Sequence, residues 1–324
     1  MKSLLIFLIT CVGLAQTFPQ PLPEREVAVT AIAGIVAAGA KWEAVWQGDN
    51  NADGLVGGPD GSIFFAQEQF NRVLRLTPGG DVSVYLSDAN GPGALAIDAM
   101  GRMLAVERTC TDPGRKGECK DPTAVSVLAP KRRVLASSVG GKSLGRVNDL
   151  VLSKRGDIYF TSGGAFHMDS KRNVEEFGGQ TGEKLRTNGI MLSRDEKTLY
   201  VTNGAALVAF DVAASGGVAN QREFAKLQGS GDGMAIDTAG RLYVTTPSGV
   251  EVVDEMGKSL GLIPSPRNAI SAAFAGPGKR TLYIVGSGAM IDGKEYVTLA
   301  GVRNNGKTIY RISMQTQGFA GRAK

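Results

Sequence analysis

The feature that most limits how this chain can fold is a motif that recurs six times. Each copy has a short apolar run, a polar or Gly-containing turn and a second apolar run, and two further strand-like stretches follow it. Successive turns are 39 to 43 residues apart except for one step of 55, with the turns at Gly61, Gly101, Gly156, Lys197, Gly240 and Lys279. Four short strands in about 40 residues predict one blade of a β-propeller.

The apolar pattern excludes a helical fold, because apolar and polar residues alternate over short runs that end in Gly, Pro, Asp or Asn. A β-sandwich would share the strands but would not explain six units of similar length. We therefore predict an all-β, six-bladed β-propeller over residues 46–318. Residues 19–45 are expected to hold a Pro-containing leader and a ring-closing strand. That strand falls in the stretch 27–46 and should pair with residues 308–312.

Residues 1–18 have the pattern of a secretory signal peptide. Lys2 precedes an apolar run from Leu4 to Leu14, and Gly13 and Ala15 are small residues at plausible cleavage positions. The run is shorter than the roughly 18 apolar residues of a membrane anchor. We therefore expect an exported protein, periplasmic or extracellular, with no membrane span in the mature chain.

Two cysteines, Cys110 and Cys119, would remain after removal of the signal peptide, which contains Cys11. They flank a polar, turn-rich loop of eight residues. In an oxidising compartment a pair this close can form a disulfide. The alternative is a metal site, but the pair has neither CxxC spacing nor a neighbouring His, so we favour the disulfide.

The charge balance argues against a nucleic-acid partner. The chain has 36 Lys and Arg against 31 Asp and Glu, a net charge of +5, and its longest basic cluster is residues 131–133. A nucleic-acid-binding surface would gather many basic residues on one face with aromatic residues between them. We therefore expect no nucleic acid to bind.

Oxygen-bearing side chains recur at one position of the repeat, just before the innermost strand of each blade. In a propeller these positions surround the mouth of the central channel. The six positions are Asp53, Gly93, Asn148, Asn188, Asp232 and Asn268, and all of them except Gly93 carry an oxygen-bearing side chain. Each Asn or Asp alone would be an ordinary turn residue, but together they predict a functional site at the channel mouth.

Three segments that contain these positions resemble the senescence-marker-protein/gluconolactonase family of six-bladed propellers. The segments are RVNDLVLSKRGDIYFTS, TNGIMLSRDEKTLYVTN and DGMAIDTAGRLYVTT, and their order and spacing match the family's Asn-Asp, Asn-Gly and Asp-Gly motifs. The resemblance runs over roughly residues 50–315. It implies a divalent cation at the channel mouth, with Asp53, Asn148, Asn188 and Asp232 as its ligands. The family's first ligand is usually a Glu in an EGP-like motif, whereas this chain has Asp53 in ADGL.

The resemblance also implies individual roles. Arg146, two residues before Asn148, stands where some members contact substrate, although a plain surface charge is equally consistent with its sequence context. Asp232 would accept a proton as well as bind the cation and is the predicted catalytic residue. Carboxylate and amide oxygens suit Ca²⁺, which we favour, or Mg²⁺ or Mn²⁺, with Zn²⁺ as a weaker alternative. Such a cation can polarise a lactone carbonyl and activate a water molecule.

The predicted function is a metal-dependent hydrolase that opens a small lactone, with sugar lactones included. The alternative is a non-catalytic propeller that binds a carbohydrate or a protein and holds a structural cation. Asp53 in place of Glu favours this alternative, whereas Asn148, Asn188 and Asp232 favour the enzyme. A strictosidine-synthase-like condensing propeller is weaker, because its catalytic carboxylate cannot be located. The single histidine, His167, is expected to lie in a loop without a catalytic role.

Overall fold

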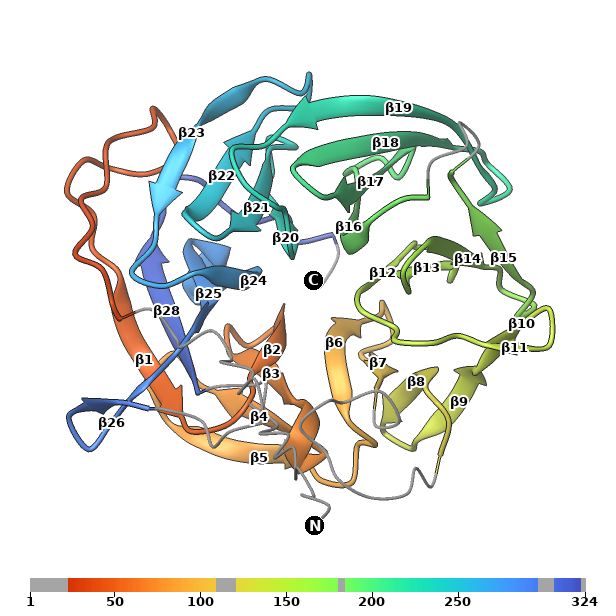
Figure 1. The fold of residues 1–324 in the computed structure, drawn as a ribbon, viewed down its shortest axis with the longest axis horizontal. Coiled ribbons are helices and arrows are strands. Elements are labelled where there is room, and N and C mark those ends of the chain that lie inside the picture. Colours follow the sequence, from red (N-terminus) through yellow and green to blue (C-terminus); the bar gives the residue numbers. More distant parts are fainter. Residues whose placement is uncertain (1–22, 109–120, 180–183, 297–305, 322–324) are drawn as a thin grey trace, which may run out of the picture.

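The computed structural model describes residues 23–108, 121–179, 184–296 and 306–321. Within these ranges the chain forms six four-stranded antiparallel sheets arranged around a central axis (Figure 1). This confirms the predicted all-β, six-bladed β-propeller. The predicted signal peptide and both Cys110 and Cys119 lie outside the described residues.

Each of the first five blades is built from four consecutive strands, named here from the innermost outwards. Blade 1 contains β2 (Asp53–Gly57), β3 (Ile63–Gln67), β4 (Arg72–Leu76) and β5 (Val82–Leu86). Blade 2 contains β6 (Pro92–Ile97), β7 (Met103–Glu107), β8 (Ala124–Ala129) and β9 (Arg133–Ala136). Blade 3 contains β12 (Leu150–Leu152), β13 (Ile158–Thr161), β14 (Ala165–Met168) and β15 (Val174–Phe177). Blade 4 contains β16 (Thr187–Leu192), β17 (Thr198–Asn203), β18 (Ala206–Val212) and β19 (Val218–Lys226). Blade 5 contains β20 (Met234–Ile236), β21 (Leu242–Thr246), β22 (Gly249–Val253) and β23 (Ser259–Pro264).

Blade 6 is assembled from both ends of the chain. Its strands are β24 (Ala269–Ala275), β25 (Thr281–Ser287), β28 (Lys307–Ser313) and β1 (Glu43–Gly48). The outermost strand β1 runs antiparallel to β28, with Gly48 opposite Lys307. Upstream of β1, residues 31–40 form turns, in which Ile32 and Val36 make an isolated bridge.

Among the described residues, four smaller strands and two short helices lie outside the blades. They are the hairpins β10 (Ser138–Val139) with β11 (Lys142–Ser143) and β26 (Met290–Ile291) with β27 (Lys294–Glu295), and the 3-10 helices η1 (Glu68–Phe70) and η3 (Pro277–Lys279). Among the described residues there is no helix long and apolar enough to cross a membrane.

The turn that joins the two innermost strands of a blade explains why Gly recurs in the sequence motif. Gly61, Gly101, Gly156 and Gly240 have φ angles between +74° and +92°, a conformation that residues with a side chain rarely adopt. Each of these turns can therefore reverse the chain tightly enough for neighbouring strands to pair.

The hydrophobic core is divided among the spaces between adjacent blades. The innermost strands are buried on both faces, as in β2, whereas the outermost strand of the same blade, β5, exposes Val82, Val84 and Tyr85. One apolar cluster lies between blades 1 and 2 and another between blades 2 and 3. Packing between the blades therefore holds the inner strands, and the residues that precede them, in fixed positions around the channel.

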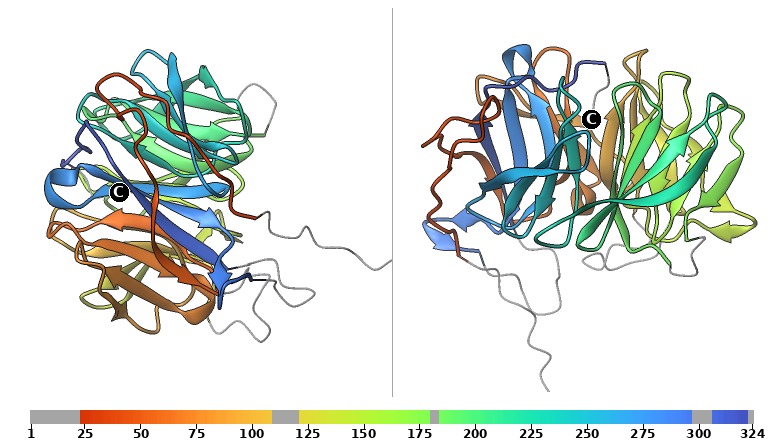
Figure 2. Two further views of the ribbon diagram at one scale, coloured as in Figure 1. Left: turned by 90° about the vertical axis from the view of Figure 1, so that its left-hand side faces the viewer. Right: turned by 90° about the horizontal axis from the view of Figure 1, so that it is seen from above.

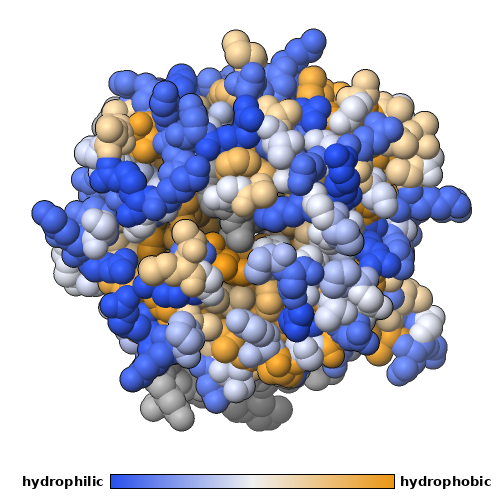
Figure 3. Space-filling view, turned by 180° about the vertical axis from the view of Figure 1, so that it is seen from behind, coloured by the Kyte–Doolittle hydropathy of each residue, from blue (hydrophilic) through white to orange (hydrophobic). Residues whose placement is uncertain are grey.

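The two ends of the central channel differ. The innermost strands all begin at one end, called the mouth, and finish at the opposite end, called the rear. Residues 314–321 cross the rear, where Gly318 N–H donates to Lys279 O at 2.8 Å and Phe319 N–H donates to Ile236 O at 3.0 Å. The C-terminus consequently lies near the middle of the ring in Figure 1 and at one end of the channel in the side views of Figure 2. On this rear face a hydrophobic region lies near the centre, with hydrophilic side chains around much of the rim (Figure 3).

Candidate functional site

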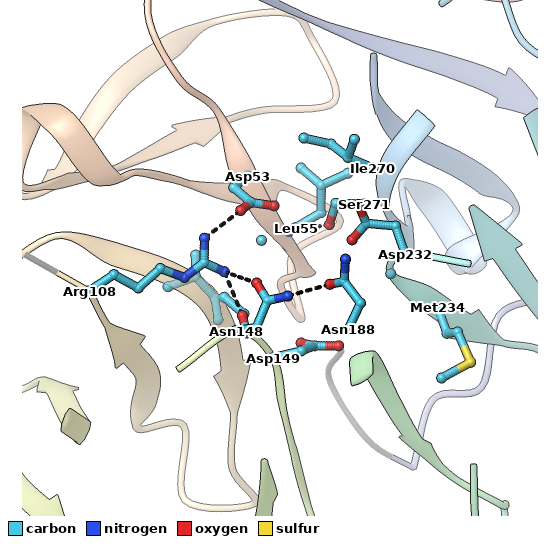
Figure 4. A pocket seen from close by; sticks show the side chains of 14 residues that line it. Asp53, Leu55, Arg108, Asn148, Asp149, Asn188, Asp232, Met234, Ile270 and Ser271 are labelled. Atoms are coloured by element: carbon cyan, nitrogen blue, oxygen red, sulfur yellow. Dashed lines mark hydrogen bonds and ion pairs between the residues drawn. The ribbon is translucent and has the colours of Figure 1, made fainter. Parts of the chain in front are cut away.

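Four of the residues predicted from the repeat meet at the mouth of the channel. Asp53 begins β2, Asn188 is the second residue of β16, and Asn148 and Asp232 lie two residues before β12 and β20. All four line one pocket of about 20 Å³ (Figure 4). A space of this size holds about one water molecule or one ion. The structure therefore brings the predicted ligand residues together, and their role as ligands stays a prediction.

A glycine follows three of these residues, and the structure gives the reason. A Cβ on Gly54 would lie 2.3 Å from Ala94 Cα, and a Cβ on Gly189 would lie 2.1 Å from Asp232 O. At Gly233 the same atom would be 3.0 Å from the next blade's main chain. The innermost strands approach each other so closely at the mouth that only glycine fits. The Asp-Gly and Asn-Gly pairs thus place a polar side chain in the channel directly beside a blade contact.

Arg108, which sequence reasoning did not single out, is the most densely bonded side chain of the site. It follows β7 and is 3% exposed. Its Nε donates to Val147 O at 2.8 Å, and its Nη2 donates to the main-chain oxygen of Asn148 at 2.5 Å and to Oδ1 of the same residue at 2.8 Å. Its Nη1 donates to Asp53 Oδ2 at 2.8 Å and to Glu68 Oε2 at 3.4 Å. All five guanidinium N–H donors are therefore used within the protein, and Arg108 connects blades 1, 2 and 3.

Gly93 is the blade 2 member of the repeated mouth positions, and it makes room for this guanidinium. A Cβ at Gly93 would lie 2.0 Å from Arg108 Nε and 2.1 Å from Cζ. Blade 2 therefore has no oxygen-bearing side chain at its mouth position, Gly93. It contributes instead the guanidinium of Arg108, which follows its second strand, β7. Burial lowers the pKa of Arg108, but the charges of Asp53 and Glu68 outweigh burial and raise it above its ordinary value, so the guanidinium stays charged.

The opposite side of the pocket carries an uncompensated carboxyl group. Asp232 is partly exposed at the mouth, but its carboxyl group lies deep enough for burial to raise its pKa well above the usual value. The negative charges of Asp53 and Asp149 raise it further, while Arg108 and a hydrogen bond from Asn188 act in the other direction. Without a further positive charge in the pocket, the neutral acid form of Asp232 is favoured.

Hydrogen bonds between blades hold the two amides in place. Asn148 Nδ2 donates to Asn188 Oδ1 at 2.5 Å. The adjacent carboxylate of Asp149 accepts from the main-chain N–H of Leu150 at 2.8 Å and of Ile190 at 3.0 Å. Asp149 thus uses its oxygens to fix the main chain of blades 3 and 4, and its negative charge remains close to the pocket.

Two other residues discussed from the sequence lie outside this pocket. Arg146 makes a bidentate ion pair with buried Glu68, with Nη1 to Oε1 at 3.0 Å and Nη2 to Oε2 at 3.1 Å, and its side chain is 38% exposed. It is absent from the pocket wall among the described residues, so its contact with substrate stays a prediction. Asn268 is also absent from the wall, where Ile270 and Ser271 represent blade 6.

The expectation that His167 lies in a loop is wrong. His167 belongs to β14 and is buried, stacked on Tyr159 with 5.0 Å between the ring centroids. Its ring nitrogens lie 3.4 Å from Asp157 Oδ1 and 3.1 Å from Glu175 Oε1. The glycines before it suggested a loop, but they form only the turn into the third strand of blade 3.

Lys307 is a second cation near the mouth that the sequence did not reveal. It begins β28 and is 6% exposed. Burial lowers its pKa to about 8, and the charge of Asp53 opposes this shift. Both Arg108 and Lys307 stand at strand ends in the second or third layer of a blade, so a search confined to the residues before innermost strands could not find them.

The chemistry of the pocket fits a hard divalent cation. Its ion-sized space is lined by the guanidinium of Arg108, the carboxylates of Asp53, Asp149 and Asp232 and the amides of Asn148 and Asn188. Carboxylate and amide oxygens are the ligands that Ca²⁺ and Mg²⁺ prefer. Burial, together with the nearby charges of Asp53 and Asp149, raises the pKa of Asp232, and a bound cation would oppose this shift. In the described part of the chain, no group of three or more Asp, Glu, His or Cys side chains is arranged to hold a metal ion.

Comparison with known proteins places these features in a family. A family model described as the SMP-30/Gluconolactonase/LRE-like region matches residues 90–288, more than half of the chain. The chain belongs to this family. The matched range includes Asn148, Asn188 and Asp232 and begins after Asp53, the position at which the chain departs from the family motif.

Relatives of this family agree in fold and differ in sequence. A gluconolactonase of Zymomonas mobilis is 25% identical over 272 residues, which is 69% of this chain and 72% of that protein. The structure of a gluconolactonase from Xanthomonas campestris has a TM-score of 0.70 and 20% identity, covering 92% of this chain and 98% of that one. The calcium-binding protein regucalcin from Agrobacterium tumefaciens has a TM-score of 0.65 and 16% identity, covering 86% and 96%.

Proposed function

We propose that the protein is a cation-dependent lactonase that hydrolyses a small, gluconolactone-like ring. The observation that carries the proposal is the convergence of Asp53, Asn148, Asn188 and Asp232, from four blades, on one ion-sized pocket. Membership of the SMP-30/gluconolactonase/LRE-like family and a gluconolactonase among the relatives support this activity. The calcium-binding regucalcin structure supports Ca²⁺ as the first cation to test.

The residues of the pocket have distinct tasks in this proposal. Asn148, Asn188, Asp232 and the carboxylate of Asp53 would hold the cation, which when bound supplies a positive charge that polarises the lactone carbonyl. Asp53 Oδ2 and Asn148 Oδ1 accept hydrogen bonds from Arg108 in this structure, so a bound cation would have to share these oxygens with the guanidinium or displace it from them.

Asp232 has the proton-transfer task. In its carboxylate form it accepts a proton from water as the water oxygen bonds to the lactone carbonyl carbon. The ring C–O bond then breaks, and the proton passes from Asp232 to the leaving alkoxide oxygen. The product is a hydroxy acid, which ionises and releases a proton to solvent.

The test is a panel of lactones assayed by acid release. Each lactone is measured with the protein as purified, after treatment with a chelator, and after restoring Ca²⁺, Mg²⁺, Mn²⁺ or Zn²⁺ singly. We expect hydrolysis of at least one small lactone, its loss with chelator and its recovery with one or more cations. Recovery with no cation, in a protein that remains folded by circular dichroism, would contradict cation dependence.

The non-catalytic alternative makes a different prediction in the same experiment. A binding module with a structural cation would bind the cation by calorimetry yet hydrolyse no lactone at any cation concentration. That combination of results would replace the lactonase proposal.

Export and the disulfide remain proposals as well, since residues 1–18, Cys110 and Cys119 lie outside the described part of the chain. Sequencing the N-terminus of the mature protein tests the first, with a start expected between about residues 16 and 20. Titration of thiols in the unfolded, unreduced mature protein tests the second, with no free thiol expected. An intact Met1 or two free thiols would contradict the respective proposal.

A further inference from the structure

A second, larger depression opens at the mouth beside the ion-sized pocket. This groove has a volume of about 430 Å³ and lies over blades 3 to 5, between Gly163, the segment 184–188, Gly204 and Ser230. Its volume falls in the range of small-molecule sites, about 300–1,000 Å³. Asn188 lines both the groove and the ion-sized pocket, so the two lie side by side.

The size difference decides where a substrate can lie. A space of about 20 Å³ admits one ion or water and excludes a lactone ring. A lactone with its carbonyl at Asn188 must place the rest of its atoms outside that pocket. The adjoining groove provides the room for those atoms.

The groove is positively charged. Lys184 and Arg186 line it, both are exposed, and the described residues of its wall include no carboxylate. Within the described ranges neither side chain has an ion pair or a hydrogen bond. The other two arginines at the mouth differ, because Arg108 and Arg146 are both paired with Glu68.

Arg186 has a fixed main chain and an unpaired charged end. Its N–H donates to Asn203 Oδ1 at 2.8 Å, and its carbonyl accepts from Gly204 N–H at 3.2 Å. A Cβ on Gly204 would lie 2.6 Å from Arg186 Nη2, so the guanidinium lies against the main chain of the β17–β18 turn. The turn thus presents the guanidinium at the edge of the groove.

We propose that this groove is the subsite for an anionic group of the substrate, so that the protein acts on a lactone that carries a carboxylate or a phosphate away from its ring carbonyl. The inference rests on the proposed lactonase function. Guanidinium forms paired, charge-assisted hydrogen bonds with either anion.

The experiment compares three lactones in the cation-loaded protein: neutral D-glucono-1,5-lactone, its 6-phosphate, and D-glucaro-1,4-lactone, which carries a carboxylate. We expect kcat/KM for at least one anionic lactone to exceed that for the neutral one tenfold or more. Arg186→Met should lower kcat/KM for the preferred anionic lactone at least tenfold, chiefly through KM, and change the neutral lactone less than twofold. The preferred anion distinguishes a phosphate subsite from a carboxylate subsite.

Two matched variants act as controls. Arg186→Lys keeps the charge and should retain part of the preference, whereas Arg133→Met removes an exposed arginine on the outer strand β9 and should leave all three rates unchanged. Equal or better hydrolysis of the neutral lactone, with Arg186→Met affecting all three alike, would overturn the subsite while the lactonase function stands.

A separate measurement covers failure of the lactonase function itself. If no lactone is hydrolysed, calorimetry with gluconate 6-phosphate and with glucarate tests the groove directly. Binding that is lost in Arg186→Met and kept in Arg133→Met supports an anion site without lactonase activity. Absence of binding to the unsubstituted protein overturns the inference.

Discussion

The acidic side chains on the two sides of the channel mouth have different electrostatic partners. On the side of blades 1 to 3, the oxygens of Asp53 and Asn148 accept hydrogen bonds from the internal guanidinium of Arg108 (Figure 4). On the side of blades 4 and 5, Asn188 donates a hydrogen bond to Asp232, and burial together with the charges of Asp53 and Asp149 raises the pKa of Asp232. The Arg108 side is balanced within the protein, whereas the Asp232 side is balanced by a proton or by an added cation.

From this difference we expect the Arg108 side to matter mainly for stability and the Asp232 side mainly for function. On the paired side, removal of one partner would leave a buried charge uncompensated, which is strongly destabilising. On the other side, the buried carboxyl group of Asp232 lowers the stability of the cation-free protein once it ionises, and in the proposed function it would favour a bound cation. The four predictions below test this division, beginning with the largest expected effect.

Replacement of Asp232 should have the largest effect on activity. Asp232→Ala removes a cation ligand and the proton acceptor, so we expect lactone hydrolysis to fall by about 10²–10⁴-fold even at saturating cation. Asn148→Ala and Asn188→Ala each remove one neutral oxygen, and raising the cation concentration should partly restore their rates. Initial rates across a cation titration provide the measurement. Asp232→Ala with the unsubstituted rate would contradict the assigned role.

Replacement of Arg108 should have the largest effect on stability. Arg108→Met leaves the partly buried carboxylate of Asp53 without its guanidinium and Glu68 with Arg146 alone, and breaking a buried pair in this way costs about 3–5 kcal/mol. Denaturant unfolding in the presence of chelator measures the loss.

A glycine pair provides a milder test of the same contact. Gly93→Ala keeps the charge of Arg108 but displaces its guanidinium, so it should also destabilise the protein. Gly79→Ala is the control, because a Cβ there has no neighbour closer than 3.6 Å. Equal stability of the Gly93 and Gly79 variants would show that the position of the guanidinium is unimportant.

The raised pKa of Asp232 predicts a pH dependence of the cation-free protein. Below pH of about 3.9, the ordinary Asp value, both folded and unfolded chains hold the proton. As the pH rises above that value, the Asp232 carboxyl group ionises in the unfolded chain before it ionises in the folded chain, and this favours unfolding. The free energy of unfolding therefore falls with rising pH until the pH passes the pKa of Asp232 in the folded protein. Each pH unit in that window corresponds to about 1.4 kcal/mol.

Asp232→Asn isolates this effect. In chelator it should be more stable than the unsubstituted protein at pH 7 and nearly equal to it at pH 3.5, as measured by urea unfolding. Cation affinity of the unsubstituted protein should rise with pH over the same window, because binding displaces a proton. A stability difference independent of pH would contradict the assignment.

The smallest effect is expected at Asp53. Asp53→Glu lengthens the side chain toward the usual family residue, and the carboxylate can still accept from Arg108. We expect cation affinity to be preserved or to increase by less than tenfold in calorimetric titration. A large loss of affinity would show that the shorter carboxylate is needed for the contact with Arg108.

The sequence was sufficient for the fold and for one class of site residue. The six turns share a spacing and, in four copies, a glycine at positive φ, so the blade could be recognised from local pattern alone. Asp53, Asn148, Asn188 and Asp232 occupy equivalent repeat positions, and equivalent positions meet at one end of a propeller.

Residues whose importance comes from neighbouring blades could not be predicted in this way. Arg108 and Glu68 follow second strands, and their partners lie 40 and 78 positions away at Asn148 and Arg146. Gly93, the one mouth position without a side chain, was the only local sign that a group from elsewhere fills its space. His167 was misassigned because its burial depends on strand pairing with Tyr159, which no local pattern reveals.

The C-terminal segment across the rear of the channel has a kinetic consequence. Gly318 and Phe319 are hydrogen-bonded to Lys279 of blade 6 and Ile236 of blade 5, so residues 314–321 lie across the rear, and a substrate of the proposed site would enter and leave at the mouth. Substrate must then enter by the route through which the hydroxy acid leaves, and the two compete for one passage. An anionic product held by Arg186 would delay the next substrate, so turnover would slow as product accumulates, well before the lactone is consumed.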